Sequence, residues 1–306
     1  MTRYEPAIDV NAIEAIDIHA HIEVDGNGHL AHPQPLQDGM AAYFGPHEPL
    51  ALDDVAAYYR ERNMAAVVFT VDARTALGTE PNSIEEIAEG AARNNDVLIP
   101  FGSVDPHLGD KALEIVRRLH GDFGVRGMKF HPSLQAFDPS DPKFAPLWAL
   151  LQELELPAVF HSGQTGVGAG LPGGYGIKLR YSNPILVDDV AADFPHLKIT
   201  LAHPAVPWQD EQISIATHKA NVWIDLSGWS PKYFAPALIR NINSLLQDKA
   251  LFGSDLPALT PDRWLADFAK LELKDVVRPK ILKDNAVALL GLAPDRGGCP
   301  DCGPRR

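Results

Sequence analysis

Short apolar runs rich in β-branched residues recur along the chain, and each is followed by a segment with helical spacing. Successive runs begin about 34 residues apart, which is enough for a strand and a crossover helix. Eight such units predict a parallel (β/α)8 TIM barrel built as a single domain. The expected strands span residues 12–19, 65–72, 97–105, 124–131, 156–163, 198–204, 221–228 and 250–255.

Segments with helical periodicity fill the intervals, and Asp and Pro cluster where they begin, as helix starts prefer. An open doubly wound sheet is the alternative topology, but no GxGxxG or P-loop motif follows any strand. The expected helices span residues 53–63, 83–94, 110–120, 143–154, 188–194, 208–219, 234–246, 261–271 and 275–292.

Two connections are too long to be plain turns. Residues 22–52 and 162–184 are rich in Gly and follow the first and fifth strands, on the face where barrel active sites lie. We expect them to form a lid and pocket walls, with a flexible insertion as the alternative. The barrel is expected to occupy residues 1–292, and the Gly- and Pro-rich tail 293–306, with its lone CxxC, is expected to be disordered.

The charge balance restricts the partners. The chain has 306 residues with 27 basic and 40 acidic side chains, a net charge of −13. This charge argues against nucleic acid and against an anionic membrane surface, which are themselves negative. No window reaches the roughly 18 apolar residues of a membrane helix, and the N-terminus has no signal-peptide core. We expect a cytoplasmic protein that acts on a small molecule.

Polar residues stand at the carboxyl ends of several strands. The first strand ends in His19 and His21, whose side chains share one side of an extended chain. The fifth, sixth and eighth strands end in His161, His203 and Asp255. In a closed barrel these residues converge on one mouth. Because imidazoles and a carboxylate suit Zn²⁺ or another divalent transition metal, the pattern predicts a metal site with a position open for water or substrate.

Other residues near the strand ends are candidates for substrate contact. Lys129 and His131 lie on one side of the fourth strand, where they either contact a substrate carboxylate or end the strand. Arg180 and Tyr181 come from the long fifth connection, and an Arg there suits bidentate binding of a carboxylate, with a surface ion pair as the alternative. Trp229 lies just beyond the seventh strand.

Further strand-end side chains could support the metal ligands. A carboxylate there could fix the tautomer of a metal-bound imidazole, although a structural role is the stronger interpretation for each of these residues taken alone. The candidates are Asp72, Asp105, Asp225 and Ser227.

The motifs DIHAH, GMKFHP, VFHSG, LAHP, DLSGW and LFGSDLP occur in this order. Together they resemble the amidohydrolase superfamily over residues 16–292, and within it the amidohydrolase-2 group. That group includes the decarboxylases of aminocarboxymuconate semialdehyde and γ-resorcylate. The resemblance implies a metal held by His19, His21, His161 and Asp255, with His203 in proton transfer or in contact with the metal-activated species.

The resemblance leaves the role of Lys129 open. In some amidohydrolases a fourth-strand Lys is carbamylated and bridges two metals, whereas the group that this chain resembles usually has one. We expect one divalent ion, Zn²⁺ first and Mn²⁺ as the alternative. A homodimer is expected by family analogy alone.

Three functions are compatible with these residues. A divalent metal lowers the pKa of bound water to about 7, which favours hydrolysis of a small carboxylated or aromatic ester, lactone or amide. Asp255 and His203 would act in proton transfer. The second is non-oxidative decarboxylation of an aromatic or muconate-type acid. The third is an inactive barrel that only binds a metal or ligand. We expect the first.

Overall fold

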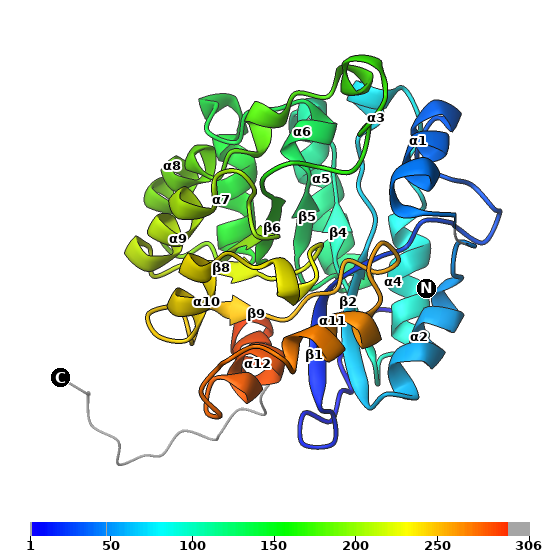
Figure 1. The fold of residues 1–306 in the computed structure, drawn as a ribbon. Helices are drawn as coiled ribbons and strands as arrows, with labels where there is room; N and C mark the ends of the chain where they lie inside the picture. The colour runs from blue at the N-terminus through cyan, green and yellow to red at the C-terminus, as the bar shows by residue number, and fades with distance from the viewer. Residues whose placement is uncertain (1, 47, 293–306) are drawn as a thin grey trace, which may run out of the picture.

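Short parallel strands lie at the centre of the molecule and helices surround them (Figure 1). The structure is a computed structural model that describes residues 2–46 and 48–292. Within these residues the strands are β1 (Ala15–His21), β2 (Met64–Phe69), β3 (Leu98–Pro100), β4 (Gly102–Ser103), β5 (Met128–Phe130), β6 (Ala158–His161), β7 (Ile199–Ala202), β8 (Val222–Asp225) and β9 (Ala250–Leu251).

The strands form two hydrogen-bonded ladders, β1-β2-β3 and β4-β5-β6-β7-β8-β9. The third expected strand is divided between them at Phe101. The amide of Phe101 donates to the Val68 carbonyl (3.0 Å), whereas the amide of Gly102 donates to the Gly127 carbonyl on the other side (2.8 Å). One stretch of chain therefore serves both neighbours, which explains why nine strands replace the eight expected.

The first and last strands meet at a second seam. The amide of Ile18 donates to the Phe252 carbonyl (3.0 Å), and the amide of Asp255 donates to the His19 carbonyl (2.9 Å). Ala20 and Leu256 form an isolated parallel bridge. The predicted TIM-barrel architecture is confirmed, with isolated backbone bonds in place of a continuous ladder at this seam.

The helices between the strands begin and end within a few residues of the expected positions, but the C-terminal segment is shorter and begins with a π turn. They are α1 (Gln34–Phe44), α2 (Leu52–Arg60), α3 (Arg74–Leu77), α4 (Ile84–Arg93), α5 (Asp110–Arg118), α6 (Pro132–Gln135), α7 (Ala145–Glu153), α8 (Ile185–Asp193), α9 (Gln209–His218), α10 (Pro236–Ile242), α11 (Pro261–Phe268) and α12 (Asn285–Leu290). Short 3-10 or π turns are η1 (Pro106–Leu108), η2 (Leu119–Phe123), η3 (Pro142–Phe144), η4 (Pro172–Gly176), η5 (Leu179–Ser182), η6 (Pro231–Tyr233) and η7 (Lys280–Asp284).

Helix α1 lies inside the connection 22–52, where the sequence predicted only a lid loop. Pro33 precedes its first turn, and Leu36 is buried. Gly39 faces Leu171 of the connection 162–184, so closely that an added Cβ would lie 3.0 Å from the Leu171 Cδ1. Packing against a segment distant in sequence therefore supports this helix, which local periodicity did not reveal.

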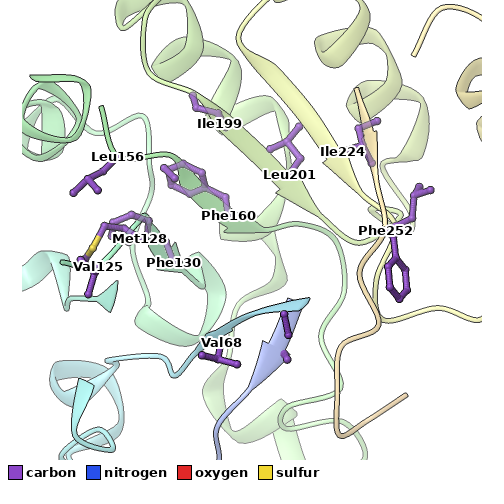
Figure 2. Packing of buried hydrophobic residues seen from close by; sticks show 14 of the residues in the cluster. Val68, Val125, Met128, Phe130, Leu156, Phe160, Ile199, Leu201, Ile224 and Phe252 are labelled. Atoms are coloured by element: carbon purple, nitrogen blue, oxygen red, sulfur yellow. The ribbon is translucent and has the colours of Figure 1, made fainter. Parts of the chain in front are cut away.

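Alternate residues of the strands fall into two apolar layers. On β2, Ala66 and Val68 pack in the outer cluster under the helices, whereas Val67 and Phe69 belong to the inner cluster. Figure 2 shows the outer layer, in which Phe130 and Phe160 of neighbouring strands stack with ring centroids 5.3 Å apart. This alternation is the one expected of barrel strands covered by helices.

Helix α12 covers the amino-terminal ends of the strands and lies near β1 and β9 (Figure 1). Lys198, just before β7, donates to the Leu289 carbonyl (3.0 Å), and Asn285 donates to the Ala250 carbonyl (2.7 Å). Leu289 and Leu290 belong to the inner apolar cluster. Since this end is closed by apolar packing, the carboxyl ends of the strands remain for a site.

Two further expectations concern the C-terminal tail and membrane helices. The tail 293–306 and its cysteines lie outside the described residues. Across residues 2–46 and 48–292, no helix combines the length and the apolar character needed to cross a membrane.

Asp17 fixes an irregularity in β1. The pairing of β1 with β2 shifts register between Asp17 and Ala20. Asp17 Oδ1 accepts from the amides of His19 (2.9 Å) and Ser254 (3.0 Å), and its Oδ2 accepts from the Tyr59 hydroxyl (2.7 Å). Burial raises the pKa of Asp17 to about 7, although these hydrogen bonds oppose the rise. One carboxyl group therefore joins β1, the end of β9 and α2.

Replacing Asp17→Ala should lower the free energy of unfolding by about 3 kcal/mol, because three buried donors lose their acceptor. Urea unfolding of the purified chain measures this difference. Tyr59→Phe removes one of the three bonds and should cost about 1 kcal/mol. Equal losses in the two variants would show that Asp17 contributes nothing beyond its bond to Tyr59.

Candidate metal centre

Three ligand atoms from β1 and the segment after β9 converge at the carboxyl end of the barrel. His19 Nε2 lies 3.3 Å from His21 Nε2, and each lies 3.2 Å from Asp255 Oδ1. Ligands placed tetrahedrally about 2.1 Å from one ion are roughly 3.4 Å apart, so these spacings fit a shared divalent cation. A ligand atom of His203 joins those of His19 and Asp255 in a group whose members all lie within 4.8 Å of one another.

A buried network orients two of these imidazoles. His19 Nδ1 lies 2.5 Å from Asp225 Oδ2, and the Ser227 hydroxyl donates to the same oxygen (2.8 Å). His203 Nδ1 lies 2.9 Å from the Ser227 oxygen. Because the Ser227 proton is donated to Asp225, this oxygen accepts a hydrogen bond from His203 Nδ1. The network therefore assigns a proton to Nδ1 of both His19 and His203 and leaves each Nε2 with a free lone pair. Asp225 thus makes the contact with an imidazole that a strand-end carboxylate was expected to make.

The electrostatics favour neutral imidazoles and an ionised carboxylate. Burial, reinforced by Lys129, lowers the pKa of His19 well below its usual value. Burial alone would raise the pKa of Asp255, but the neighbouring imidazoles, His203 foremost, outweigh it and hold that pKa below the ordinary range. These are the protonation states that a divalent metal requires of its ligands.

The backbone is strained where two of these residues stand. His203 has a φ of +67° and Asp255 a φ of +76°, in the left-handed region that non-glycine residues rarely adopt. Gly228 approaches both, and a Cβ there would lie 2.5 Å from His203 Nδ1. Strain of this kind at strand ends is typical of functional sites.

His161 lies next to His203 rather than within the compact group. Its ring centroid is 4.7 Å from that of His203, and its ring stacks on His131 at 3.8 Å with an interplanar angle of 7°. Among the described residues, its buried Nε2 has no hydrogen-bond partner. Burial lowers the pKa of His161 well below its usual value, so the imidazole is neutral and one of its two ring nitrogens carries a lone pair. An unpartnered buried nitrogen facing the group fits a fourth ligand position or a substrate contact.

Lys129 is fully buried and is not the solvated side chain that lysine usually is. Its Nζ lies 3.0 Å from His19 Nε2 and 4.8 Å from the centroid of the Phe69 ring. Burial lowers the pKa of Lys129 to about 8. Its amine therefore interacts with the same lone pair that a metal would use.

A cavity of about 140 Å³ opens above this group. Both long connections contribute to its walls, as the sequence predicted, and Trp229 and His131 line it. His131 Nδ1 accepts from the Leu134 amide (3.2 Å), which turns its Nε2 toward Thr165 (3.3 Å). The lining residues that sequence analysis missed include His32, Met40, Phe44 and Thr165, whose only signal was the Gly-, Pro- and His-rich composition of their segments.

The expectation that Arg180 and Tyr181 contact substrate stays a prediction. Neither residue lines the cavity, and Arg180 is exposed with its guanidinium donating to the Tyr181 hydroxyl (3.2 Å). The cause is the turn η5, which buries Ser182 against Ser133 (2.6 Å between the hydroxyl oxygens) and leaves Arg180 on the outside.

Two other strand-end carboxylates also have structural partners. Asp72 binds the guanidinium of Arg74 (2.9 Å), and Asp105 accepts from the amides of Thr75 (2.7 Å) and His107 (2.9 Å). Neither contacts an imidazole of the site through these bonds.

The fold and the cluster together define a TIM-barrel protein with a candidate metal centre at the carboxyl ends of its strands. The family model described as Amidohydrolase matches residues 16–292. The chain therefore belongs to the amidohydrolase family, whose members include metal-dependent hydrolases and decarboxylases, and the resemblance seen in the sequence is confirmed. A comparison with curated proteins gives no match.

Solved structures share the fold. An uncharacterised TIM-barrel protein from Bordetella bronchiseptica is 22% identical with a TM-score of 0.74, over 90% of this chain and 98% of that one. A dihydroxybenzoic acid decarboxylase from Polaromonas sp. JS666, with bound manganese and 2-nitroresorcinol, is 17% identical with a TM-score of 0.62, over 92% and 97%. A probable 2-pyrone-4,6-dicarboxylic acid hydrolase from Acinetobacter baumannii, with citric acid bound, is 14% identical with a TM-score of 0.61, over 91% and 100%.

Replacing Asp225→Asn should weaken divalent-metal binding by about 10–100-fold, because the amide no longer fixes His19 with Nε2 free. Titration calorimetry with Zn²⁺ or Mn²⁺ measures the affinity. Asp72→Asn is the matched control, a buried strand-end carboxylate paired with Arg74 instead, and its affinity should stay at the parent value. An unchanged affinity in Asp225→Asn would contradict the assigned network.

Replacing Lys129→Met should strengthen metal binding by about tenfold or more, because a buried cation 3.0 Å from His19 Nε2 no longer repels the ion. One equivalent should still bind, as measured by elemental analysis. Loss of metal from this variant would instead indicate that Lys129 is itself a ligand, as a carbamylated bridge between two ions would be.

Proposed function

We propose that this protein is a metal-dependent hydrolase that acts on a small ester, lactone or amide at the barrel mouth. The observation that carries the proposal is the convergence of His19 Nε2, His21 Nε2 and Asp255 Oδ1 at 3.2–3.3 Å from one another. Three ligand atoms at this spacing, two imidazoles and one carboxylate, suit a catalytic rather than a closed structural site.

His19, His21 and Asp255 would hold the ion, with His161 or His203 as the fourth protein group. The unpartnered Nε2 of His161 supports this fit. A mixed nitrogen and oxygen donor set suits Zn²⁺, which we propose first, and also Mn²⁺. When bound, the ion supplies Lewis acidity and lowers the pKa of a coordinated water.

The chain itself supplies two proton acceptors beside the ion. Asp255 is ionised, and His203 keeps a free Nε2 because its Nδ1 donates to Ser227. Burial lowers the pKa of His203, so this imidazole is neutral at pH 7. A proton released by the attacking water can pass to either group, and His203 can then return it to the leaving group.

Decarboxylation of a small aromatic acid is the second candidate. Lys129, with a pKa of about 8, can donate a proton inside the cavity, as the carbon that loses CO₂ requires. The fold shared with the Polaromonas decarboxylase supports this alternative. Proton acceptors favour hydrolysis and a proton donor favours decarboxylation, so the reaction must be observed directly.

Metal content is the first test. The purified protein should carry about one equivalent of zinc or manganese per chain, and His161→Ala should bind it at least tenfold more weakly. His196→Ala, which replaces an exposed imidazole, is the control and should keep the parent affinity. A protein that binds no divalent ion would refute the proposal.

The reaction is identified by following two products. The metal-loaded protein is incubated with lactones and with hydroxybenzoates while acid release and CO₂ are monitored separately. Acid release from a lactone that is abolished by Asp255→Asn supports hydrolysis. Release of CO₂ without acid release would refute hydrolysis and support decarboxylation. Neither product from any substrate would favour a barrel that only binds.

A further inference from the structure

The hydroxyl group of Thr165 has two nitrogen neighbours on the wall of the cavity. Thr165 belongs to the connection 162–184 and lines the cavity above the metal group. The amide of Val167 donates to its hydroxyl oxygen at 3.1 Å, and His131 Nε2 lies 3.3 Å from the same oxygen. Whether His131 donates to this oxygen or accepts from it depends on which ring nitrogen carries the proton.

The first turn of α6 determines where the His131 proton lies. The Leu134 amide donates to His131 Nδ1 at 3.2 Å. A ring nitrogen that accepts a hydrogen bond carries no proton, so the proton of this imidazole is on Nε2. His131 is therefore the opposite tautomer to His19 and His203, whose protons are on Nδ1. Its Nε2–H donates to Thr165.

Two contacts fix the direction of the His131 ring. Gln135 is fully buried, its Oε1 accepts from the His131 amide (2.8 Å), and its Nε2 donates to the carbonyls of Asp72 (2.7 Å) and Val104 (3.0 Å). This side chain joins the ends of three strands and holds the backbone of His131. The ring itself stacks on His161 with centroids 3.8 Å apart. The direction of the Nε2–H bond is therefore set by the fold.

The Thr165 hydroxyl is left with a single free function. A hydroxyl has two lone pairs and one proton. The Val167 amide and the His131 Nε2–H occupy the two lone pairs. Across residues 2–46 and 48–292, this hydroxyl makes no other hydrogen bond. Its proton is therefore available to a ligand in the cavity, whereas its oxygen is not.

The segment that carries Thr165 is held on both sides. The Gln164 amide donates to the Val206 carbonyl at 2.7 Å. Gly166 lies directly under Phe44 of α1, since a Cβ added to this glycine would lie 2.1 Å from the Phe44 Cζ. A donor that is fixed before the ligand arrives loses little conformational freedom on binding.

We infer that Thr165 is a specificity-determining residue whose hydroxyl donates to a carbonyl or ether oxygen of the substrate and does not accept from a donor group at the same place. The inference rests on the proposed function only in taking this cavity as the substrate site, and it is the same for hydrolysis and for decarboxylation. It adds a determinant of selectivity that comes from the long connection instead of the strand ends.

The first test observes the tautomer directly. In protein labelled with ¹⁵N-histidine and loaded with diamagnetic Zn²⁺, the imidazole nitrogen shifts should show His131 as a neutral ring with its proton on Nε2. The signal is assigned by its loss in His131→Asn. The same tautomer is expected without metal, because the Leu134 amide belongs to the chain itself. A proton on Nδ1, or a cationic ring at neutral pH, would overturn the inference.

The second test compares ligands of matched shape on the metal-loaded protein by titration calorimetry. The probes are 3- and 4-methoxyphenol, whose ether oxygen only accepts, and 3- and 4-(methylamino)phenol, which carry an N–H donor in its place. Thr165→Val removes the hydroxyl at nearly constant shape. It should weaken binding of at least one methoxyphenol by about fivefold and leave the matching methylamino compound within twofold.

Thr165→Ser, which keeps the hydroxyl, should bind the methoxyphenols as the parent does. Thr75→Val is the control, since Thr75 is exposed and does not line the cavity, and it should change neither affinity. Equal weakening of both ligands by Thr165→Val would show a packing role and refute the contact. The inference also fails if no methoxyphenol depends on the hydroxyl.

A third variant tests whether His131 occupies the second lone pair. In His131→Asn the new Oδ1 can still accept from the Leu134 amide, but the Nε2–H is gone. The Thr165 oxygen then has a lone pair for an N–H donor, so a methylamino compound should bind about fivefold more tightly than to the parent. Unchanged binding would contradict the assigned hydrogen bond from His131.

The metal content of every sample is measured alongside. A protein without metal refutes the proposed function, whatever the tautomer of His131. A protein that holds its metal but binds the methoxyphenols independently of Thr165 refutes only this inference.

Discussion

The candidate site depends on the seam between the first and last strands. There the Asp255 amide donates to the His19 carbonyl at 2.9 Å, so a backbone bond joins two residues that stand 236 positions apart and also supply ligand atoms. Asp17 reinforces the seam by accepting from the amide of Ser254 as well as that of His19. A shift of one residue at this seam would move a ligand to the opposite face of its strand, because side chains alternate.

Burial makes this arrangement costly without an ion. Four buried imidazoles and two carboxylates gather at the mouth with His21 and Lys129, and burial penalises the charged form of the buried imidazoles. Burial keeps the His19 and His203 imidazoles neutral. A short hydrogen bond pairs His19 Nδ1 with Asp225, and the lone pair of His19 stays on Nε2. A cation at the centre would satisfy Asp255 and the nitrogens together, and the Lys129 amine contacts one of these nitrogens, His19 Nε2. The same burial that tunes the protonation states thus prepares the group for metal.

Strands and connections differ in how far the sequence determines them. The strand ends were predictable because alternation, parallel topology and a common barrel mouth constrain where His19, His161 and Asp255 can lie. Which histidine lies nearest to His19 and Asp255 was less predictable. His203 stands inside the compact group and His161 lies beside it. His203 has a left-handed φ, and an extended strand would not predict the side-chain direction that this gives. Asp225 could be identified only as one of several equivalent carboxylates until its bond to His19 was visible.

The sequence determines less about the two long connections than about the strand ends. Composition identified residues 22–52 and 162–184 as cavity walls, yet it missed α1 and did not show that Arg180 stands outside the cavity lining. The sequence by itself determined the barrel, the family and the residues at the strand ends, because these follow from periodicities of two and 3.6 residues and from short motifs. Only the tertiary structure decided which side chains line the cavity, because the packing of Gly39 on Leu171 and of Ser182 on Ser133 joins segments far apart in the chain. Local pattern carries no record of such contacts.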